Sequence, residues 1–407
     1  MRMEQIRVAP RQGIRVLLAP RSRVSEARMR IGGLFVASLA AVQSPSKAAE
    51  TLDVVGPVQA AAHAPLQELN PFYPAQAVLY GKLSVGYVKT DTKQPYADSS
   101  TSGIGSGTRS YWGLRAAETL GNGFFAFGQF EHSLRVSNGE TATTGEVVNA
   151  ASCKETSNGA SVGGCFPFWT KTVVGLSRRD LGRLELGRRE QPAWLVSLTL
   201  DPWDGNTSAS PAERLYYPPL RGFVRTSRSA TYSSPVQQPF WGEVQVAQSE
   251  AGNSSHPNGA SVNYLLGGLY AGVGWQHWTP RNMAIPMGVT YDDGSVRYYL
   301  ALATGRVDGA DGVPFRYRTI FAGAALKAMA LGDPGRNEWR FGLARFATGT
   351  PKSDTKAALG YVYKLSQRTS LQANAAVTWR ANDRGTGVDI AIVHAFARDF
   401  RGPQPLR

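Results

Sequence analysis

Few residue combinations in this sequence of 407 residues could support catalysis or metal binding. The five His residues are scattered and show no spacing typical of metal ligands. Residues Gly159-Ala-Ser-Val-Gly163 match the nucleophile elbow of serine hydrolases, but they lie in a polar stretch where no strand-to-helix turn is expected. The neighbouring carboxylates Asp292 and Asp293 fall in an expected tight turn. We therefore expect no enzyme activity, no metal and no cofactor.

Alternation of apolar and polar residues organises the chain from residue 77 to residue 396 and would place its side chains on β-strands. In the segment 371–380, Leu371 and Trp379 share the apolar face, whereas Asn374 and Thr378 share the polar face. A strand of a soluble sandwich shows the same period, so a single segment does not establish the fold class. Repetition in segments of about ten residues separated by turns is typical of a transmembrane β-barrel.

Sixteen such segments are recognisable, and an even number is what closure of an antiparallel bacterial barrel requires. We predict strands at residues 77–88, 108–117, 123–134, 168–178, 183–190, 222–232, 240–248, 261–266, 269–278, 283–291, 296–305, 316–328, 338–347, 355–363, 369–380 and 386–396. Trp112, Trp275, Trp339 and Trp379 lie near strand ends or on apolar faces, as aromatic girdles would. The expected fold class is therefore all-β, a 16-stranded antiparallel transmembrane β-barrel.

Composition excludes a bundle of membrane-spanning helices. Hydrophobic residues make up only 42% of the chain, and no stretch beyond the N-terminal region approaches the roughly 18 apolar residues that a spanning helix needs. The apolar run 31–42, preceded by Arg28 and Arg30 and followed by Ser46-Lys47-Ala48, has the pattern of a secretory signal. We predict an N-terminal extension at 1–28, a signal peptide at 29–48, a linker or periplasmic arm at 49–76, the barrel at 77–396 and a tail at 397–407.

Charge is less extreme once the predicted signal is set aside. The whole chain carries a formal net charge of +14, and residues 1–48 contribute half of it through eight Arg and one Lys against two Glu. A moderately basic mature chain does not require nucleic acid as a partner. The two cysteines, Cys153 and Cys165, lie in a polar stretch of an exported chain, where a disulfide that staples a loop is plausible chemistry.

Several stretches resemble the Gram-negative trimeric porin family, the general diffusion porins of the outer membrane. The resemblance covers roughly residues 77 to 396 and is carried by the order and spacing of these motifs. The motifs are Leu79-Tyr-Gly-Lys-Leu-Ser-Val-Gly86, Tyr111-Trp-Gly-Leu-Arg-Ala-Ala-Glu-Thr-Leu-Gly-Asn-Gly123, Val174-Gly-Leu-Ser-Arg-Arg-Asp-Leu-Gly-Arg-Leu-Glu-Leu-Gly-Arg188, Gly360-Tyr-Val-Tyr-Lys-Leu-Ser-Gln-Arg-Thr369 and Val393-His-Ala-Phe396.

The resemblance implies a homotrimer in the cell outer membrane, in contact with outer-membrane lipid, that passes small hydrophilic solutes and ions. It also implies that the third loop, about residues 192–220, folds inward and presents acids to a basic wall. The acids expected on this loop are Asp201, Asp204 and Glu213. The bases expected on the wall of the pore constriction are Lys82, Arg109, Arg115 and Arg225.

Some of these residues have an ordinary explanation as well. Asp201 and Asp204 could equally be turn formers, and the alternative for the bases is that they are solvated surface charges. The sequence also departs from the family, because Tyr111 and Thr170 stand where wall bases are common and Ser84 stands where many members have Asp.

Three functions fit the sequence. The first is passive diffusion of small hydrophilic solutes and ions with mild anion preference. The second is a substrate-specific porin for an anionic or sugar solute, in which Trp194 and Trp203 would form a stacking track. The third is an exported β-rich surface binding protein without a pore.

Overall fold

The computed structural model describes residues 75–93, 98–139, 169–205, 207–216, 224–235, 239–248, 256–308, 313–328, 335–348, 353–380 and 383–401. The strands are β1 (Ala75–Lys93), β2 (Asp98–Gly105), β3 (Ser110–Gly121), β4 (Phe124–Leu134), β5 (Lys171–Arg178), β6 (Gly182–Glu190), β7 (Arg225–Ser233), β8 (Phe240–Ala247), β9 (Asn258–Leu266), β10 (Leu269–Thr279), β11 (Asn282–Asp292), β12 (Val296–Asp308), β13 (Pro314–Ala328), β14 (Asn337–Ala347), β15 (Asp354–Lys364), β16 (Thr369–Arg380) and β17 (Asp383–Arg401). Two short helices, α2 (Pro192–Thr199) and α3 (Ala212–Leu215), lie between β6 and β7.

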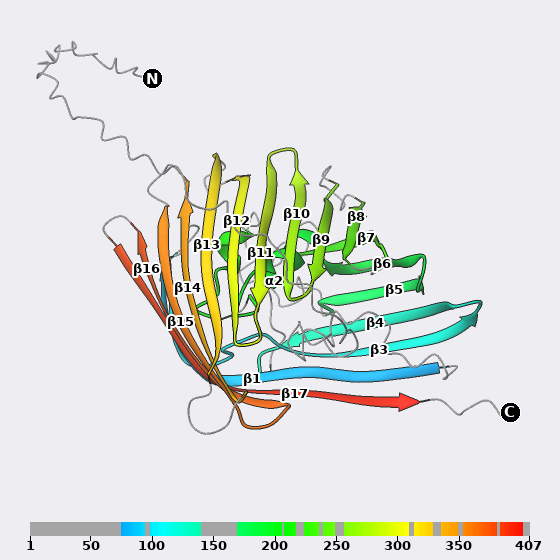
Figure 1. The fold of residues 1–407 in the computed structure, drawn as a ribbon, viewed down its shortest axis with the longest axis horizontal. Coiled ribbons are helices and arrows are strands. Elements are labelled where there is room, and N and C mark those ends of the chain that lie inside the picture. The colour runs from blue at the N-terminus through cyan, green and yellow to red at the C-terminus, as the bar shows by residue number, and fades with distance from the viewer. Residues whose placement is uncertain are drawn as a thin grey trace, which may run out of the picture. The chain divides into compact units, whose positions relative to one another are not determined.

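The strands form one closed antiparallel barrel of sixteen positions. Consecutive strands pair from β3 round to β17, and β17 pairs with β1 over the register Gln76–Arg401 to Asp91–Thr386. β2 and β3 both pair with β1, one after the other along its length, so together they fill a single position of the ring. Figure 1 shows the neighbouring strands side by side. The predicted 16-stranded barrel is confirmed.

Side chains alternate between two faces of this barrel, and the outer face is the apolar one. On β17, Ile390 and Ile392 are 56% and 44% exposed, while Ala391 between them and Asp389 before Ile390 are buried. The same inversion of a soluble protein's pattern recurs on β8, β12 and β14. Exposed apolar side chains with buried polar side chains suit a barrel whose outside meets hydrocarbon. The predicted faces of residues 371–380 are confirmed, since Leu371 and Trp379 are exposed and Asn374 is buried.

Tight hairpins connect strands at one end of the barrel. Between β3 and β4, Asn122 and Gly123 have φ values of 51° and 77°, the left-handed conformation that a two-residue hairpin turn demands and that Asn-Gly tolerates. Gly267 and Gly268 make the same kind of turn between β9 and β10, with φ values of 56° and 85°. Both turns fall at gaps between predicted strands, although the predicted strand 123–134 began one residue too early, at Gly123.

Connections at the opposite end differ widely in length. Residues 135–170 and 191–224 separate strands widely, but β10 and β11 are joined by only Pro280 and Arg281.

Two strands are longer than predicted. β1 continues to Lys93, beyond the predicted end at residue 88, because it pairs there with β2. β17 likewise runs to Arg401, past Phe396, because the beginning of β1 lies alongside it.

A compact hydrophobic core fills the space between the segment 191–216 and the inner face of the strands. Its most buried large side chains include Trp203 and Tyr216 from the segment, and Tyr317, Phe321 and Phe346 from β13 and β14.

Among the described residues, no helix has the length and apolar character needed to cross a membrane.

Candidate pore-lining site

Charged side chains gather on the inner face of β1 to β7. Lys82 comes from β1, Arg109 directly precedes β3, and the next four strands of the ring contribute one residue each. This group, called here the charged wall, comprises Lys82, Arg109, Glu131, Lys171, Glu190 and Arg225. It contains four bases and two acids, so positive charge exceeds negative charge.

The two acids hold three of the bases. Arg109 pairs with Glu131, and its guanidinium also donates to Ser133 at 2.8 Å and Thr170 at 3.0 Å. Glu190 accepts from Arg225 Nε at 3.2 Å and lies 3.9 Å from Lys171 Nζ. Buried bases need such partners, because removing a charge from water without compensation is costly.

Tyr111 lies between Lys82 and Arg109. Its ring centroid is 5.9 Å from Lys82 Nζ and 4.9 Å from Arg109 Cζ, distances at which a cation is attracted to an aromatic face. Lys82 also donates to Thr108 at 3.3 Å. The ring of Tyr111 thus stabilises two neighbouring bases.

Arg115 faces the same side of β3 as Arg109 but lies elsewhere along the strand. In the register of β1 and β3, Tyr111 is opposite Lys82 whereas Arg115 is opposite Val78. Four strand residues correspond to roughly 13 Å. The structure therefore brings Lys82, Arg109 and Arg225 together and places Arg115 nearer the hairpin end.

The segment 191–216 packs on the inner face, opposite the exposed apolar surface. Helix α2 contacts β8 to β11, and Figure 1 shows it beside these strands. Gln191 anchors the segment where it leaves the barrel wall, because its amide oxygen accepts from Trp278 Nε1 at 3.2 Å and from the hydroxyl of Tyr216. The beginning and the end of the segment are thereby tied to one side chain.

Inward-facing glycines on the strands make room for this segment. A Cβ atom at Gly360 would lie 2.4 Å from Trp203 Nε1, and one at Gly342 would lie 2.9 Å from the same ring. On β10, a Cβ atom at Gly274 would lie 2.5 Å from Ala193 Cα. Since any side chain there would collide, these glycines form the contact points, called here the seats, on which Trp203 and α2 pack.

Asp201 holds the turn after α2 together. Its carboxylate accepts from the backbone N–H groups of Trp203 and Gly205, each at 2.8 Å, and from the hydroxyl of Ser210. Burial raises the pKa of this carboxyl to about 6, against the opposing effect of those hydrogen bonds. The alternative interpretation of Asp201 as a turn former fits these contacts better than that of a pore-facing acid.

Asp204 occupies a different environment in the same turn. Its backbone is left-handed, with a φ of 57°, and the residue is only half-buried. Its carboxylate acts electrostatically on Lys82 of the charged wall and on Arg340 of β14. Of the three acids predicted on this loop, Asp204 is the one that faces the charged wall.

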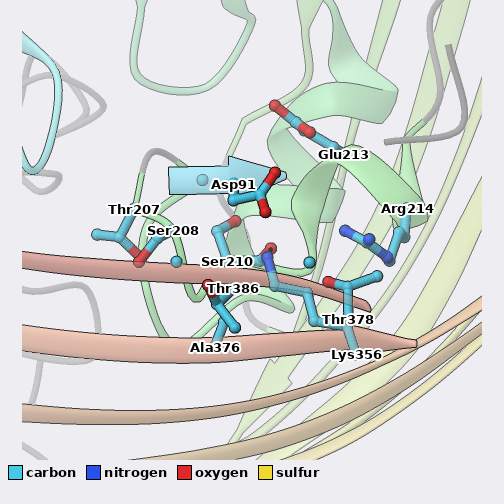
Figure 2. Close-up of a pocket in the computed structure, with 13 residues that line it drawn as sticks. Asp91, Thr207, Ser208, Ser210, Glu213, Arg214, Lys356, Ala376, Thr378 and Thr386 are labelled. Carbon is cyan, nitrogen blue, oxygen red and sulfur yellow. Dashed lines mark hydrogen bonds between the residues drawn. The ribbon is translucent and has the colours of Figure 1, made fainter. Parts of the chain in front are cut away.

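Glu213 is exposed on α3 and lines a polar cavity of about 190 Å³, shown in Figure 2. The neighbouring contacts fasten the segment to the barrel. Arg214 forms a two-pronged ion pair with Asp354 at 2.8 and 3.2 Å, and Lys356 donates to the Ser210 carbonyl at 2.7 Å. The backbone N–H of Ser208 donates to Asp389 at 2.9 Å. These contacts to β15 and β17 are called here the latch.

Sequence reasoning missed four charged residues of the site: Glu131, Lys171, Glu190 and Arg340. All four lie at inward-facing positions, and parity along the strand could have found Glu131, Lys171 and Arg340. Parity places Glu190 on the outer face, because a register shift between Gly187 and Arg189 interrupts the alternation on β6. Thr170 stands at a position where the family resemblance implies a wall base, and the next residue, Lys171, supplies a base to the wall. Cys153, Cys165 and the Gly159–Gly163 motif lie outside the described residues.

Comparisons with known proteins agree with this architecture. The family model described as Gram-negative porin matches residues 36–383. No curated protein matches the chain. Among solved structures, the anion-selective porin from Comamonas acidovorans is 21% identical with a TM-score of 0.63, and the match covers 79% of this chain and 100% of that one.

Two further structures are similar in fold. The trimer form of OmpT from Vibrio cholerae is 13% identical with a TM-score of 0.54, over 79% of this chain and 99% of that one. OmpF of Salmonella typhi in complex with daunomycin is 14% identical with a TM-score of 0.54, over 79% and 97% of the two chains. Together with the closed barrel, the family match shows that this chain belongs to the Gram-negative porins and resides in the outer membrane.

Proposed function

We propose that the chain is a general diffusion channel that lets small hydrophilic solutes and ions cross the outer membrane passively, with a mild preference for anions. One observation carries this proposal: inside a closed barrel, the charged wall faces Asp204 on a segment that packs against the opposite strands. The proposed activity is transport and not catalysis.

The geometry supports a narrowed and electrically polarised passage. The segment 191–216 occupies part of the barrel interior through its contacts with β8 to β17, so it would reduce the free cross-section. Bases on β1, β5 and β7 on one side and Asp204 on the other produce a field across the passage. Such a field orients dipolar solutes and discriminates between ions.

Excess positive charge supports the anion preference. The charged wall has four bases for two acids. Arg340 adds another base near Asp204, although its Nε forms an ion pair with Glu338 at 2.6 Å. The anion-selective porin from Comamonas acidovorans has the same fold. Because its identity with this chain is low, the likeness supports the preference less than the charged wall does.

A homotrimer is part of the proposal. It is supported by membership of the porin family and by the trimer form of OmpT, which shares the fold. The solutes and lipids in contact with the protein would be those of the outer membrane generally.

A substrate-specific porin is the second candidate, favoured by the polar cavity beside Glu213 and Arg214. The predicted stacking track does not support it. Trp194 and Trp203 are only 9% and 1% exposed, because both are packed into the core beneath the segment. A buried ring offers no face to a passing sugar.

Swelling of proteoliposomes in sugars of graded size distinguishes these candidates. A diffusion channel gives rates that fall smoothly with solute size and rise linearly with concentration. Saturation by one sugar but not by its stereoisomers would overturn the general-diffusion proposal in favour of a specific site. Absence of swelling with folded protein would support the third alternative, a β-rich binding protein without a pore.

A further inference from the structure

Four arginines face outward at one end of three adjacent strands. They are Arg306 on β12, Arg316 and Arg318 on β13, and Arg345 on β14. Arg306 lies directly opposite Arg316 in the strand register, and Arg345 lies opposite Ile320, the next outward-facing position after Arg318. This group is called here the arginine patch. Figure 1 shows the three strands side by side.

The arginine patch borders the apolar outer surface. Along the same faces follow Leu302, Ile320 and Leu343, which are 44%, 56% and 55% exposed. Beyond them, towards the other strand ends, lie the exposed aromatic side chains of Tyr298 and Trp339. The order from arginine to aliphatic to aromatic is that of a surface that passes from one membrane interface through hydrocarbon to the other interface.

The end that carries the arginine patch is the outer end of the barrel. It adjoins the connection between β12 and β13, at the same end as the long connections 135–170 and 191–224. The opposite end carries the tight turns at Asn122-Gly123 and Gly267-Gly268. In outer-membrane barrels the short turns face the periplasm and the longer loops face outward. The arginines therefore lie at the level of the outer-leaflet headgroups.

The arginine patch differs from the arginines inside the barrel in what it contacts. Inward-facing Arg109, Arg214 and Arg225 each pair with a carboxylate. By contrast, Arg345 donates to the Thr355 hydroxyl at 2.8 Å, and Arg306 donates to the carbonyl oxygens of Arg281 and Pro280.

Within the described part of the chain, no carboxylate forms an ion pair with any of the four arginines. Asp308, the acid on the same face, is hydrogen-bonded to Asn282. Among the described residues these four cations next to hydrocarbon have no carboxylate partner, and anions from the surroundings would compensate their charge.

We propose that the arginine patch binds the phosphate-bearing headgroups of outer-leaflet lipid. Guanidinium groups donate two parallel hydrogen bonds to phosphate oxygens, so two arginines opposite one another can hold one headgroup. The acyl chains of the same lipid would then lie over Leu302, Ile320 and Leu343. The proposal is independent of which solutes pass through the barrel.

Titration of lipid-depleted protein in detergent with diphosphoryl lipid A, followed by native mass spectrometry, tests the proposal. The variant Arg316→Gln/Arg318→Gln should bind this lipid roughly thirtyfold more weakly, since each basic residue near an anionic membrane surface contributes about a factor of five. The matched control is Arg368→Gln/Arg398→Gln, which removes two exposed arginines at the other end of the barrel and should leave the affinity unchanged.

Three results would overturn the proposal. The first is equal lipid affinity in wild type and patch variant, with both shown to be folded by heat-dependent gel mobility. The second is an equal loss in the control variant, or displacement of the lipid by millimolar inorganic phosphate, either of which would mean unspecific charge attraction. The third is dissociation of the assembled protein with unchanged lipid affinity, which would assign the patch to contact between copies of this chain.

Discussion

At the scale of single residues, the interior of this barrel is a set of compensated charges. Glu131 and Glu190 have less than a tenth of their side chains exposed and hold Arg109, Lys171 and Arg225 in place. The acids therefore both stabilise the wall and reduce its positive potential. Under the proposed function, ion preference would depend on this small difference between opposing charges and not on the number of bases alone.

Replacing one acid of the charged wall should strengthen the anion preference. In Glu131→Gln, one negative charge disappears from the wall next to Arg109. A unit charge some 8 Å from an ion in water contributes about 0.5 kcal/mol. Its removal favours chloride and disfavours potassium by about this amount each, so the ratio of chloride to potassium permeability should rise about sixfold. The measurement is the zero-current potential in a potassium chloride gradient.

The control for this prediction is Glu118→Gln, which makes the same chemical change at an exposed position near the hairpin end of β3. It should not alter the zero-current potential. An unchanged potential in Glu131→Gln, or a shift towards potassium, would contradict the assignment of the charged wall to the ion pathway.

Asp201 should make the stability of the segment depend on pH. Its pKa in the folded protein is about 6, above the ordinary value near 4, so folding retains a proton that the unfolded chain releases. The contribution is fully present below pH about 4 and is lost as pH rises through about 6, by roughly 2–3 kcal/mol. Thermal unfolding at pH 4 and pH 7 should therefore differ less in Asp201→Asn than in wild type.

Asp293→Asn provides the opposite comparison. Backbone N–H groups of Val296 and Ser295 hold the pKa of the Asp293 carboxyl below its ordinary value, so its contribution is present near neutral pH and lost as pH falls. If thermal unfolding of Asp201→Asn and of wild type depends on pH in the same way, the assignment of a raised pKa to the Asp201 carboxyl is wrong.

At the scale of elements, the segment between β6 and β7 is fixed by seats and by the latch. The seats are the inward glycines Gly342 and Gly360, which accept Trp203, and the latch joins Arg214, Lys356 and Ser208 across the segment and the strands. Because two kinds of contact hold it at separate points, the segment is expected to be rigid on the timescale of solute passage.

Breaking the latch should widen the passage. Replacing Arg214 by Met leaves Asp354 buried without its partner, which typically costs 3–5 kcal/mol. The segment should then leave its position part of the time, giving larger and noisier single-channel conductance. Glu213→Gln, one residue earlier and exposed, should leave conductance noise unchanged.

A second variant separates loss of the latch from general misfolding. In Arg214→Met/Asp354→Leu, no buried charge remains, and the apolar pair should restore much of the stability. Conductance as quiet as wild type in Arg214→Met, with the protein folded, would show that the latch does not fix the segment.

The predictability of these elements from sequence follows from the range of the contacts involved. The strand 369–380 was predicted with the bounds that the structure has, because alternation and its flanking turns are local. β2 was missed since its sequence Asp98–Gly105 is rich in Ser and Gly, and only pairing with β1 makes it a strand. The burial of Trp203 depends on Gly342 and Gly360, which lie more than a hundred residues away and which no local pattern reveals.

At the scale of the whole molecule, one closed barrel combines three environments. The outer face is apolar, the inner face is polar, and the segment 191–216 has its own hydrophobic core within the barrel. Covering the interior partly with a packed segment allows a wide barrel to contain a narrow passage. Under the proposed function, size selection and ion preference would both lie in one region, between Asp204 and the charged wall.

Single-channel recording with ion selectivity, using the purified protein in planar bilayers, tests this account most directly. It predicts stepwise openings in groups of three and a zero-current potential that shows chloride preferred over potassium. Folded protein that inserts without conducting would contradict the channel itself, and a clear preference for potassium would contradict the role assigned to the charged wall.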